Sequence, residues 1–252
     1  MSDFQNMIEK IKETRKSSES SPPQYECPKC KDTGVIYHPT SDGAGSCVTC
    51  GCVELKRAKK VFESSGIMEF MEVGFKGYLT YNDEILEKAR SKAIDYYKHF
   101  KDTEKDRYNS ILFCGQVGAG KTHLGVAISN NLIDIGVAVM YMPYRNVVTL
   151  LKQNITDEAA YYKELSKYLN ARVLFVDDLL KGKITESDNN ILFEIINYRY
   201  LKHLPMIVTT EKNLDELLAF DEAIGSRIIE MCKGNIVYFG RDESLNHRLR
   251  KD

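Results

Sequence analysis

The eight residues from Gly115 to Thr122, GQVGAGKT, have the types and spacing needed to hold the phosphates of a nucleotide. They fit the pattern G-x-x-x-x-G-K-[ST], between an apolar run at 110–114 and a helix-forming run that reaches about Leu132. Glycines let backbone N–H groups turn toward one anion, and a helix N-terminus adds partial positive charge. Lys121 is expected to reach the β- and γ-phosphates, and the Thr122 hydroxyl to bind Mg²⁺. The residues assigned to nucleotide binding here are Gly115, Gln116, Val117, Gly118, Ala119, Gly120, Lys121, Thr122 and His123.

Two adjacent carboxylates follow a short apolar run. Asp177 and Asp178 come directly after Val173–Val176. Ligands in open α/β sheets bind at the carboxyl ends of buried strands, so this position favours chemistry over a solvated turn. We expect Asp177 to hold Mg²⁺, directly or through water, and Asp178 to polarise the attacking water. Aspartate reaches less far than the glutamate that is common in such a position.

Cysteines cluster in one stretch near the N-terminus, where five of the seven lie between residues 27 and 52. In a chain without a secretion signal, such clustering favours a metal over disulfides. Cys27 and Cys30 form a C-x₂-C pair, and a structural Zn²⁺ takes four ligands. Spacing leaves the second pair open, since it can be Cys47 with Cys50 or Cys50 with Cys52.

The surrounding sequence must position these groups. Short apolar runs at 111–114, 137–141, 173–176, 206–209 and 236–239 alternate with helical stretches. Five strands separated by helices predict a parallel sheet covered on both faces. The expected organisation is a helix and a Ser/Pro-rich linker at 1–23, a cysteine module at 24–55, a helical connector at 56–105 and an α/β domain at 106–252.

Composition excludes several classes of protein. The net charge is −1, so any contact with nucleic acid has to be local. The apolar runs are too short to cross a bilayer, and the N-terminus lacks the apolar stretch of a signal peptide. We therefore expect a cytoplasmic protein without a membrane partner.

Several of these segments together resemble AAA+ ATPases of the DnaC/DnaI helicase-loader branch, which includes the IstB transposition helpers. The chain is similar to that branch over roughly residues 25–250. The matching segments include 110–125, which holds the phosphate-loop pattern, and 173–178, VLFVDD. Residues 205–210, PMIVTT, are similar to the sensor-1 strand, and residues 225–230, GSRIIE, are similar to the arginine-finger helix. Residues 27–34, CPKCKDTG, together with Cys50-Gly-Cys52, are similar to the zinc module of phage and Gram-positive loaders.

The resemblance assigns roles that spacing does not. It favours Cys50 and Cys52 as the remaining zinc ligands, with Cys47 as the alternative and His38 as a weaker candidate. It makes Arg227 an arginine finger that acts on a neighbouring subunit's nucleotide, although spacing alone favours a surface salt bridge, for instance to Glu230.

Two positions depart from the family's pattern. The family usually has Asn after the paired threonines, whereas Glu211 stands here, so Thr210 is the expected sensor-1 residue. The segment that carries the terminal sensor arginine is longer than usual; Arg248 is the candidate and Arg241 the alternative. The resemblance also implies no C-terminal lid domain, and it brings Phe75 and Tyr78 near the adenine.

The function implied by the resemblance is ATP hydrolysis by an oligomer that loads a hexameric replicative helicase onto single-stranded DNA. Its cofactors are ATP, Mg²⁺ and Zn²⁺, and its partners are the helicase, single-stranded DNA and further copies of the chain. A transposition helper that remodels a transposase on duplex DNA is the alternative within the class. A non-catalytic adaptor that binds zinc and ATP is the alternative outside it, and Glu211 keeps that alternative open.

Overall fold

The computed structural model describes residues 25–39, 45–66 and 72–249 of the chain. The helix and linker expected at 1–23 lie outside the described residues. The chain divides into two compact units, Met1–Val53 and Glu54–Asp252. The boundary between them falls within helix α2, Gly51–Ser64.

The first unit contains a small antiparallel hairpin. Strands β1, Val35–Pro39, and β2, Gly45–Thr49, pair with Val35 opposite Thr49. Most of their side chains are exposed, and the buried cluster of this unit consists of cysteines, with Ile36 packed against it. This hairpin was not predicted, because neither strand has a buried face that would impose an apolar alternation on the sequence.

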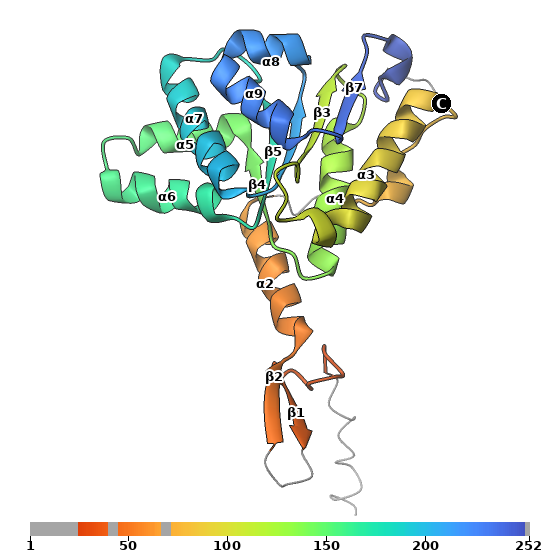
Figure 1. Cartoon of the computed structure of the whole chain (residues 1–252), viewed down its shortest axis with the longest axis vertical. Coiled ribbons are helices and arrows are strands. Elements are labelled where there is room, and N and C mark those ends of the chain that lie inside the picture. The colour runs from red at the N-terminus through yellow and green to blue at the C-terminus, as the bar shows by residue number, and fades with distance from the viewer. Residues whose placement is uncertain (1–24, 40–44, 67–71, 250–252) are drawn as a thin grey trace, which may run out of the picture. The chain divides into compact units, whose positions relative to one another are not determined.

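The second unit is built on a five-stranded sheet with all strands parallel (Figure 1). The strands lie in the order β4-β5-β6-β3-β7. Their bounds are Ile111–Gly115 for β3, Val139–Pro143 for β4, Val173–Leu179 for β5, Met206–Thr210 for β6 and Ile236–Phe239 for β7. The predicted fold class, a parallel five-stranded sheet of the α/β type, is confirmed.

Helices cover both faces of this sheet, as Figure 1 shows. Helices α3 and α4 lie on one face, with two short 3₁₀ turns, η2 and η3, nearby. Helices α5 to α9 lie on the other. The bounds are Glu84–Thr103 for α3, Lys121–Asp134 for α4, Tyr144–Gln153 for α5, Glu158–Asn170 for α6, Glu186–Lys202 for α7, Leu214–Phe220 for α8, Glu222–Met231 for α9, Phe75–Gly77 for η2 and Glu243–Leu245 for η3. None of the described helices combines the length and apolar character that crossing a bilayer requires.

Strand alternation divides the core into two clusters. Phe113 and Phe175 pack with α3 and α4, whereas their neighbours Leu112 and Leu174 pack with the helices of the other face. Successive side chains of a regular strand point to opposite faces, so alternation assigns them to the two clusters by their parity. Leu179 departs from this alternation, because the pairing of β5 with β6 is irregular between Val176 and Leu179. Parity therefore also decides which polar side chains at the strand ends face α4.

Candidate nucleotide site and cysteine cluster

The loop from Gly115 to Thr122 joins the end of β3 to the start of α4. Gly115, Gly118 and Gly120 have φ of 103°, 78° and 76°, which is backbone that favours glycine. A Cβ on Gly118 would collide with the side chain of Asn246, and one on Gly120 with the ring of Tyr78. The glycines are thus required both by conformation and by close packing.

Lys121 is buried at the first turn of α4, with 6% of its surface exposed. Its ammonium donates to the carbonyl oxygens of Gly115 and Gln116 at 2.9 and 2.6 Å. Burial lowers the pKa of Lys121, while the negative charges of Glu211 and Asp178 oppose that shift. A cation held this way at a helix N-terminus favours an anionic ligand.

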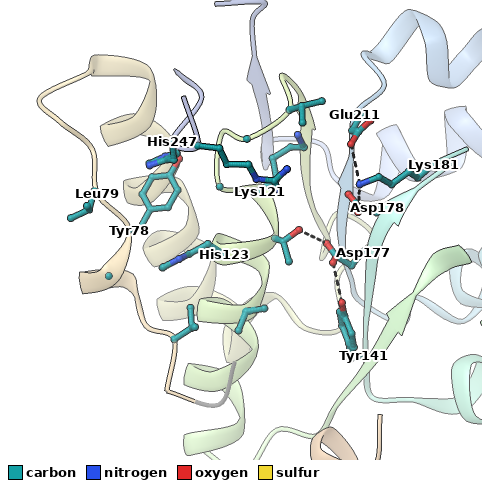
Figure 2. Close-up of a pocket in the computed structure, with 18 of the residues that line it drawn as sticks. Tyr78, Leu79, Lys121, His123, Tyr141, Asp177, Asp178, Lys181, Glu211 and His247 are labelled. Atoms are coloured by element: carbon teal, nitrogen blue, oxygen red, sulfur yellow. Dashed lines mark hydrogen bonds and ion pairs between the residues drawn. The ribbon is translucent and has the colours of Figure 1, made fainter. Parts of the chain in front are cut away.

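Asp177 accepts three hydroxyl donors at the end of β5. They are Thr122 Oγ1 at 2.8 Å, Thr209 Oγ1 at 2.6 Å and Tyr141 OH at 3.0 Å. Burial raises the pKa of Asp177, and the hydrogen bonds from Thr209, Thr122 and Tyr141 oppose that effect. The carboxylate lies beside the Thr122 hydroxyl that was expected to share a Mg²⁺ ion with it (Figure 2).

Thr210 does not have the expected place at the site. It is fully buried, and its hydroxyl donates to the carbonyl of Leu179 at 2.8 Å. Thr209, one residue earlier, donates to Asp177 instead. The alternation of side chains along β6 explains this difference. Thr209 points to the same face as Ile207, which packs with α4, whereas Thr210 points to the other face together with Val208.

A cavity of about 620 Å³ opens beside the loop, within the size range of small-molecule sites. We call it the main cavity. Figure 2 shows Tyr78, Leu79, His123 and His247 on one side of it and the charged groups on the other, with Lys121 between them. Its lining residues are Val73, Gly77, Tyr78, Leu79, Tyr81, Val117, Gly118, Gly120, Lys121, Thr122, His123, Val126, Tyr141, Asp177, Asp178, Lys181, Glu211, His247 and Arg248. An apolar and aromatic end beside a charged end suits a nucleotide, which has a base and a phosphate chain.

The other residues expected to contact the nucleotide separate into groups. Gly115 and Gln116 line a second cavity of about 300 Å³ with Arg241. Ala119 is buried, and its carbonyl accepts the Tyr78 hydroxyl at 2.8 Å. Of the two aromatic residues expected near the adenine, only Tyr78 lines the main cavity, since Phe75 packs against the core and the ring of Tyr97.

Asp178 lies on the rim of the main cavity with a positive φ of 55°. Its carboxylate pairs with Lys181 Nζ at 2.7 Å, and the same ammonium lies 3.2 Å from Glu211. The sequence analysis assigned no role to Lys181, Tyr141 or Thr209. Parity with the apolar residues of β4 and β6 could have singled out Tyr141 and Thr209, but nothing local to the sequence indicates the Lys181 contacts.

Arg227 lies away from the residues that line the main cavity. Its guanidinium packs over the rings of Phe193 and Tyr200, 5.3 and 5.5 Å from their centroids, and donates to the carbonyl of Ala223 at 2.6 Å. Glu230, its partner in the salt-bridge interpretation, pairs with Arg107 at 2.6 Å instead. Arg227 therefore contacts α7 and its own helix α9, while Arg248 lines the main cavity of its own chain.

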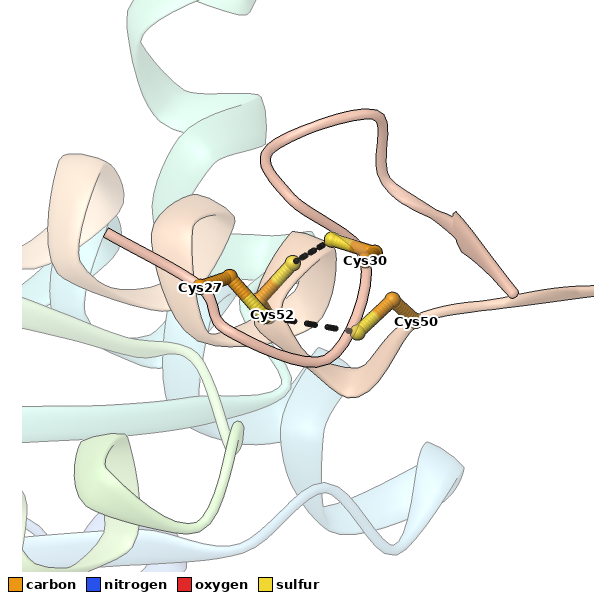
Figure 3. Close-up of side chains that lie close together, drawn as sticks. All are labelled: Cys27, Cys30, Cys50 and Cys52. Atoms are coloured by element: carbon orange, nitrogen blue, oxygen red, sulfur yellow. Dashed lines mark hydrogen bonds between the residues drawn. The ribbon is translucent and has the colours of Figure 1, made fainter. Parts of the chain in front are cut away.

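Four cysteines converge in the first unit (Figure 3). The sulfur atoms of Cys27, Cys30, Cys50 and Cys52 all lie within 4.8 Å of one another, with Cys27 to Cys50 at 3.8 Å and Cys30 to Cys52 at 3.4 Å. Four thiolates around a tetrahedral zinc, with Zn–S near 2.3 Å, would lie about 3.8 Å apart. Cys47 is exposed on β2 and is not part of this cluster.

The local backbone prepares this cluster for a cation. Backbone N–H groups of Cys30 and Lys29 lower the pKa of the Cys27 thiol to about 6, whereas hydrogen bonds with the neighbouring cysteines raise the pKa of Cys52 to about 12. The carboxylate of Asp32 accepts the Cys27 amide at 2.9 Å and fixes the turn between the first two cysteines. The donor set and spacing fit a zinc ion that all four thiolates hold.

Comparison with known proteins gives the family. The sequence model described as IstB-like ATP binding protein matches residues 88–233, which is more than half of the chain. The chain belongs to this family. XkdC, a protein of the phage-like element PBSX of Bacillus subtilis (strain 168), is 35% identical over 93% of this chain and 90% of its own length.

Two further similarities concern proteins described as helicase loaders. The replicative helicase loader DnaC of Escherichia coli (strain K12) is 27% identical over 60% of this chain and 59% of its own length. A crystal structure of the DnaC helicase loader has a TM-score of 0.55 with 22% identity, covering 68% of this chain and 98% of that one. That identity supports a shared fold alone, and the expected IstB-like family and parallel α/β fold are confirmed.

Proposed function

We propose that this IstB-like protein hydrolyses ATP as an oligomer and loads a hexameric replicative helicase onto single-stranded DNA. The observation that carries the ATPase part is the Asp177 carboxylate, 2.8 Å from the Thr122 hydroxyl in the main cavity that Lys121 also lines. The loader part rests on the similarity to DnaC in sequence and fold.

In this proposal the chain's own groups have distinct tasks. The loop amides and Lys121 bind the β- and γ-phosphates, and Arg248 on the cavity wall contributes a further positive charge. Thr122 and Asp177 supply the oxygen ligands that Mg²⁺ prefers, and the ion would neutralise charge that develops on the phosphates. Asp178 orients and polarises the attacking water. Arg227 of a neighbouring subunit stabilises the transferring phosphoryl group.

The cysteine cluster has a structural task. All four coordination places of a zinc ion would be filled by Cys27, Cys30, Cys50 and Cys52, which leaves no open position for a substrate. The exposed hairpin that the cluster supports is available for a protein partner, for which we propose the helicase.

ATP turnover measured with and without single-stranded DNA tests the enzymatic part. We expect weak turnover that DNA stimulates, that Asp178→Ala abolishes while nucleotide is still bound, and that Lys121→Ala loses together with nucleotide affinity. Normal binding without turnover in the wild-type chain would instead support the zinc- and ATP-binding adaptor.

Co-purification with purified replicative helicases, with and without ATP, tests the loader part. The resemblance to the IstB transposition helpers keeps the transposition helper as a second candidate. That candidate predicts stimulation by duplex rather than single-stranded DNA and co-purification with a transposase. The loader function and a role for the zinc module would be supported if the wild-type chain retains a helicase and the chain treated with a zinc chelator does not.

A further inference from the structure

Three charged side chains form a bridge on the wall of the main cavity. Lys181 Nζ lies 2.7 Å from Asp178 Oδ2 and 3.2 Å from Glu211 Oε1. The three residues come from the end of β5, the loop after it and the residue after β6, and all three line the main cavity. Figure 2 shows the Lys181 ammonium between the two carboxylates.

The backbone of Asp178 needs such support. Its φ of 55° lies in the left-handed region, which a non-glycine residue keeps only where its surroundings hold it. Its amide donates to Thr209 Oγ1 at 2.9 Å, and its carbonyl accepts the Lys181 amide at 3.1 Å. Lys181 is therefore bound to Asp178 through both backbone and side chain.

The bridge is too exposed to serve mainly in folding. The side chains of Asp178, Lys181 and Glu211 have 38%, 47% and 34% of their surfaces exposed. Ion pairs with this exposure contribute little to stability. An arrangement that adds little to stability yet fixes one carboxylate at a cavity wall is better explained by a demand for orientation at the site.

We propose that Lys181 is a positioning residue that orients the Asp178 carboxylate toward the attacking water, and that Glu211, the residue after β6, holds Lys181 in place. This inference rests on the proposed ATPase function. It gives Glu211 a task in this chain that the Asn usual at that position cannot perform, because a neutral amide does not form an ion pair with an ammonium. A lysine held between two carboxylates also keeps its own charge, since Asp178 and Glu211 raise the pKa of Lys181.

Four variants of the full chain, Lys181→Ala, Lys181→Arg, Glu211→Ala and the Lys181→Ala/Glu211→Ala double variant, test the proposal. The readouts are kcat for ATP, the Kd of a fluorescent ATP analogue and the midpoint of thermal unfolding. Lys181→Ala should lower kcat by roughly tenfold or more, as expected when a reacting group loses its orientation, with nucleotide affinity and thermal midpoint nearly unchanged. Lys181→Arg, which keeps the charge, should recover most of the loss.

The double variant separates a bridge from two independent residues. If Glu211 acts only by holding Lys181, Glu211→Ala should add no further loss of kcat in the Lys181→Ala background. Lys183→Ala is the matched control, because Lys183 is exposed in the same loop and forms no ion pair with Asp178 or Glu211 among the described residues. It should keep the wild-type kcat.

Four results would overturn the proposal. They are an unchanged or raised kcat in Lys181→Ala, a parallel loss of ATP affinity that Arg does not restore, additive losses in the double variant, and a similar loss in Lys183→Ala. The ATPase assignment fails separately, if the wild-type chain does not turn over ATP or if Asp178→Ala turns it over normally. If wild-type ATP turnover depends on Asp178 but not on Lys181, the proposed role of the bridge is refuted and the ATPase assignment stands.

Discussion

The buried cluster of the first unit is made of Cys27, Cys30 and Cys50, with Ile36 and Cys52 packed against it. The second unit buries two apolar clusters, one on each face of its sheet. Apolar burial alone can maintain the sheet, whereas a hairpin with exposed strands needs a staple. Because metal binding stabilises one unit and apolar burial the other, we expect the two units to respond to different perturbations.

Removing one zinc ligand should have the largest effect, confined to the first unit. Zinc binding supplies about 10–16 kcal/mol of folding free energy in small zinc modules. We expect Cys50→Ser to lose the bound metal and to make residues 25–53 sensitive to protease, while the Kd for ATP stays unchanged. Metal content per chain and limited proteolysis measure this. Cys47→Ser is the control and should retain one zinc ion per chain. A loss of ATP affinity in Cys50→Ser would show that the two units do not respond independently.

A large cavity in the core of the sheet should destabilise the second unit and leave the zinc site of the first unit intact. Phe175 is fully buried and packs between Gly125 of α4 and the ring of Tyr141. Phe175→Ala should lower the free energy of unfolding by about 3–5 kcal/mol, because it removes apolar contacts and leaves a cavity. Urea unfolding measures the change, with zinc content expected to stay at the wild-type value. Tyr162→Ala, at a side chain that is 54% exposed, should change stability by less than about 0.5 kcal/mol.

The buried acid of the site should impose a pH-dependent cost on the sheet unit. Burial raises the pKa of Asp177 in the folded chain, so the folded state binds this proton more tightly than the unfolded state. The resulting penalty is absent at low pH and complete once the pH exceeds the folded-state pKa. Asp177→Asn should therefore stabilise the nucleotide-free chain at pH 7, with a smaller gain near pH 4, while abolishing turnover. Equal destabilisation at both values would show that lost hydrogen bonds outweigh the charge.

An exposed ion pair of the sheet unit should have the smallest effect. Arg172 contacts both carboxylate oxygens of Glu104, at 2.6 and 2.8 Å, with 45% of its side chain exposed. Arg172→Ala should lower the free energy of unfolding by about 0.2–1 kcal/mol, and less at high salt. A double-mutant cycle with Glu104→Ala isolates the pair. A coupling above about 2 kcal/mol would mean that ion pairs, and not apolar burial alone, hold this unit together.

Local sequence patterns predicted the phosphate loop, the metal site and the kind of scaffold. The spacing of Gly115, Gly120 and Lys121 defined a phosphate loop, and five alternating apolar runs predicted the parallel sheet, because both are local patterns with one physical solution. The C-x₂-C pair indicated a metal site in the same way. Strand parity, read with more care, would also have selected Thr209 over Thr210.

Which distant groups meet depends on the order of the strands in the sheet. The order β4-β5-β6-β3-β7 places β6 beside β5, and this brings Thr209 to Asp177 and Glu211 to Lys181. No local pattern fixes strand order, because each strand is apolar on both faces and could pair with several others. Spacing permits either Cys47 or Cys52, and the family resemblance favours Cys52; the folded hairpin carries Cys47 away from the other sulfurs.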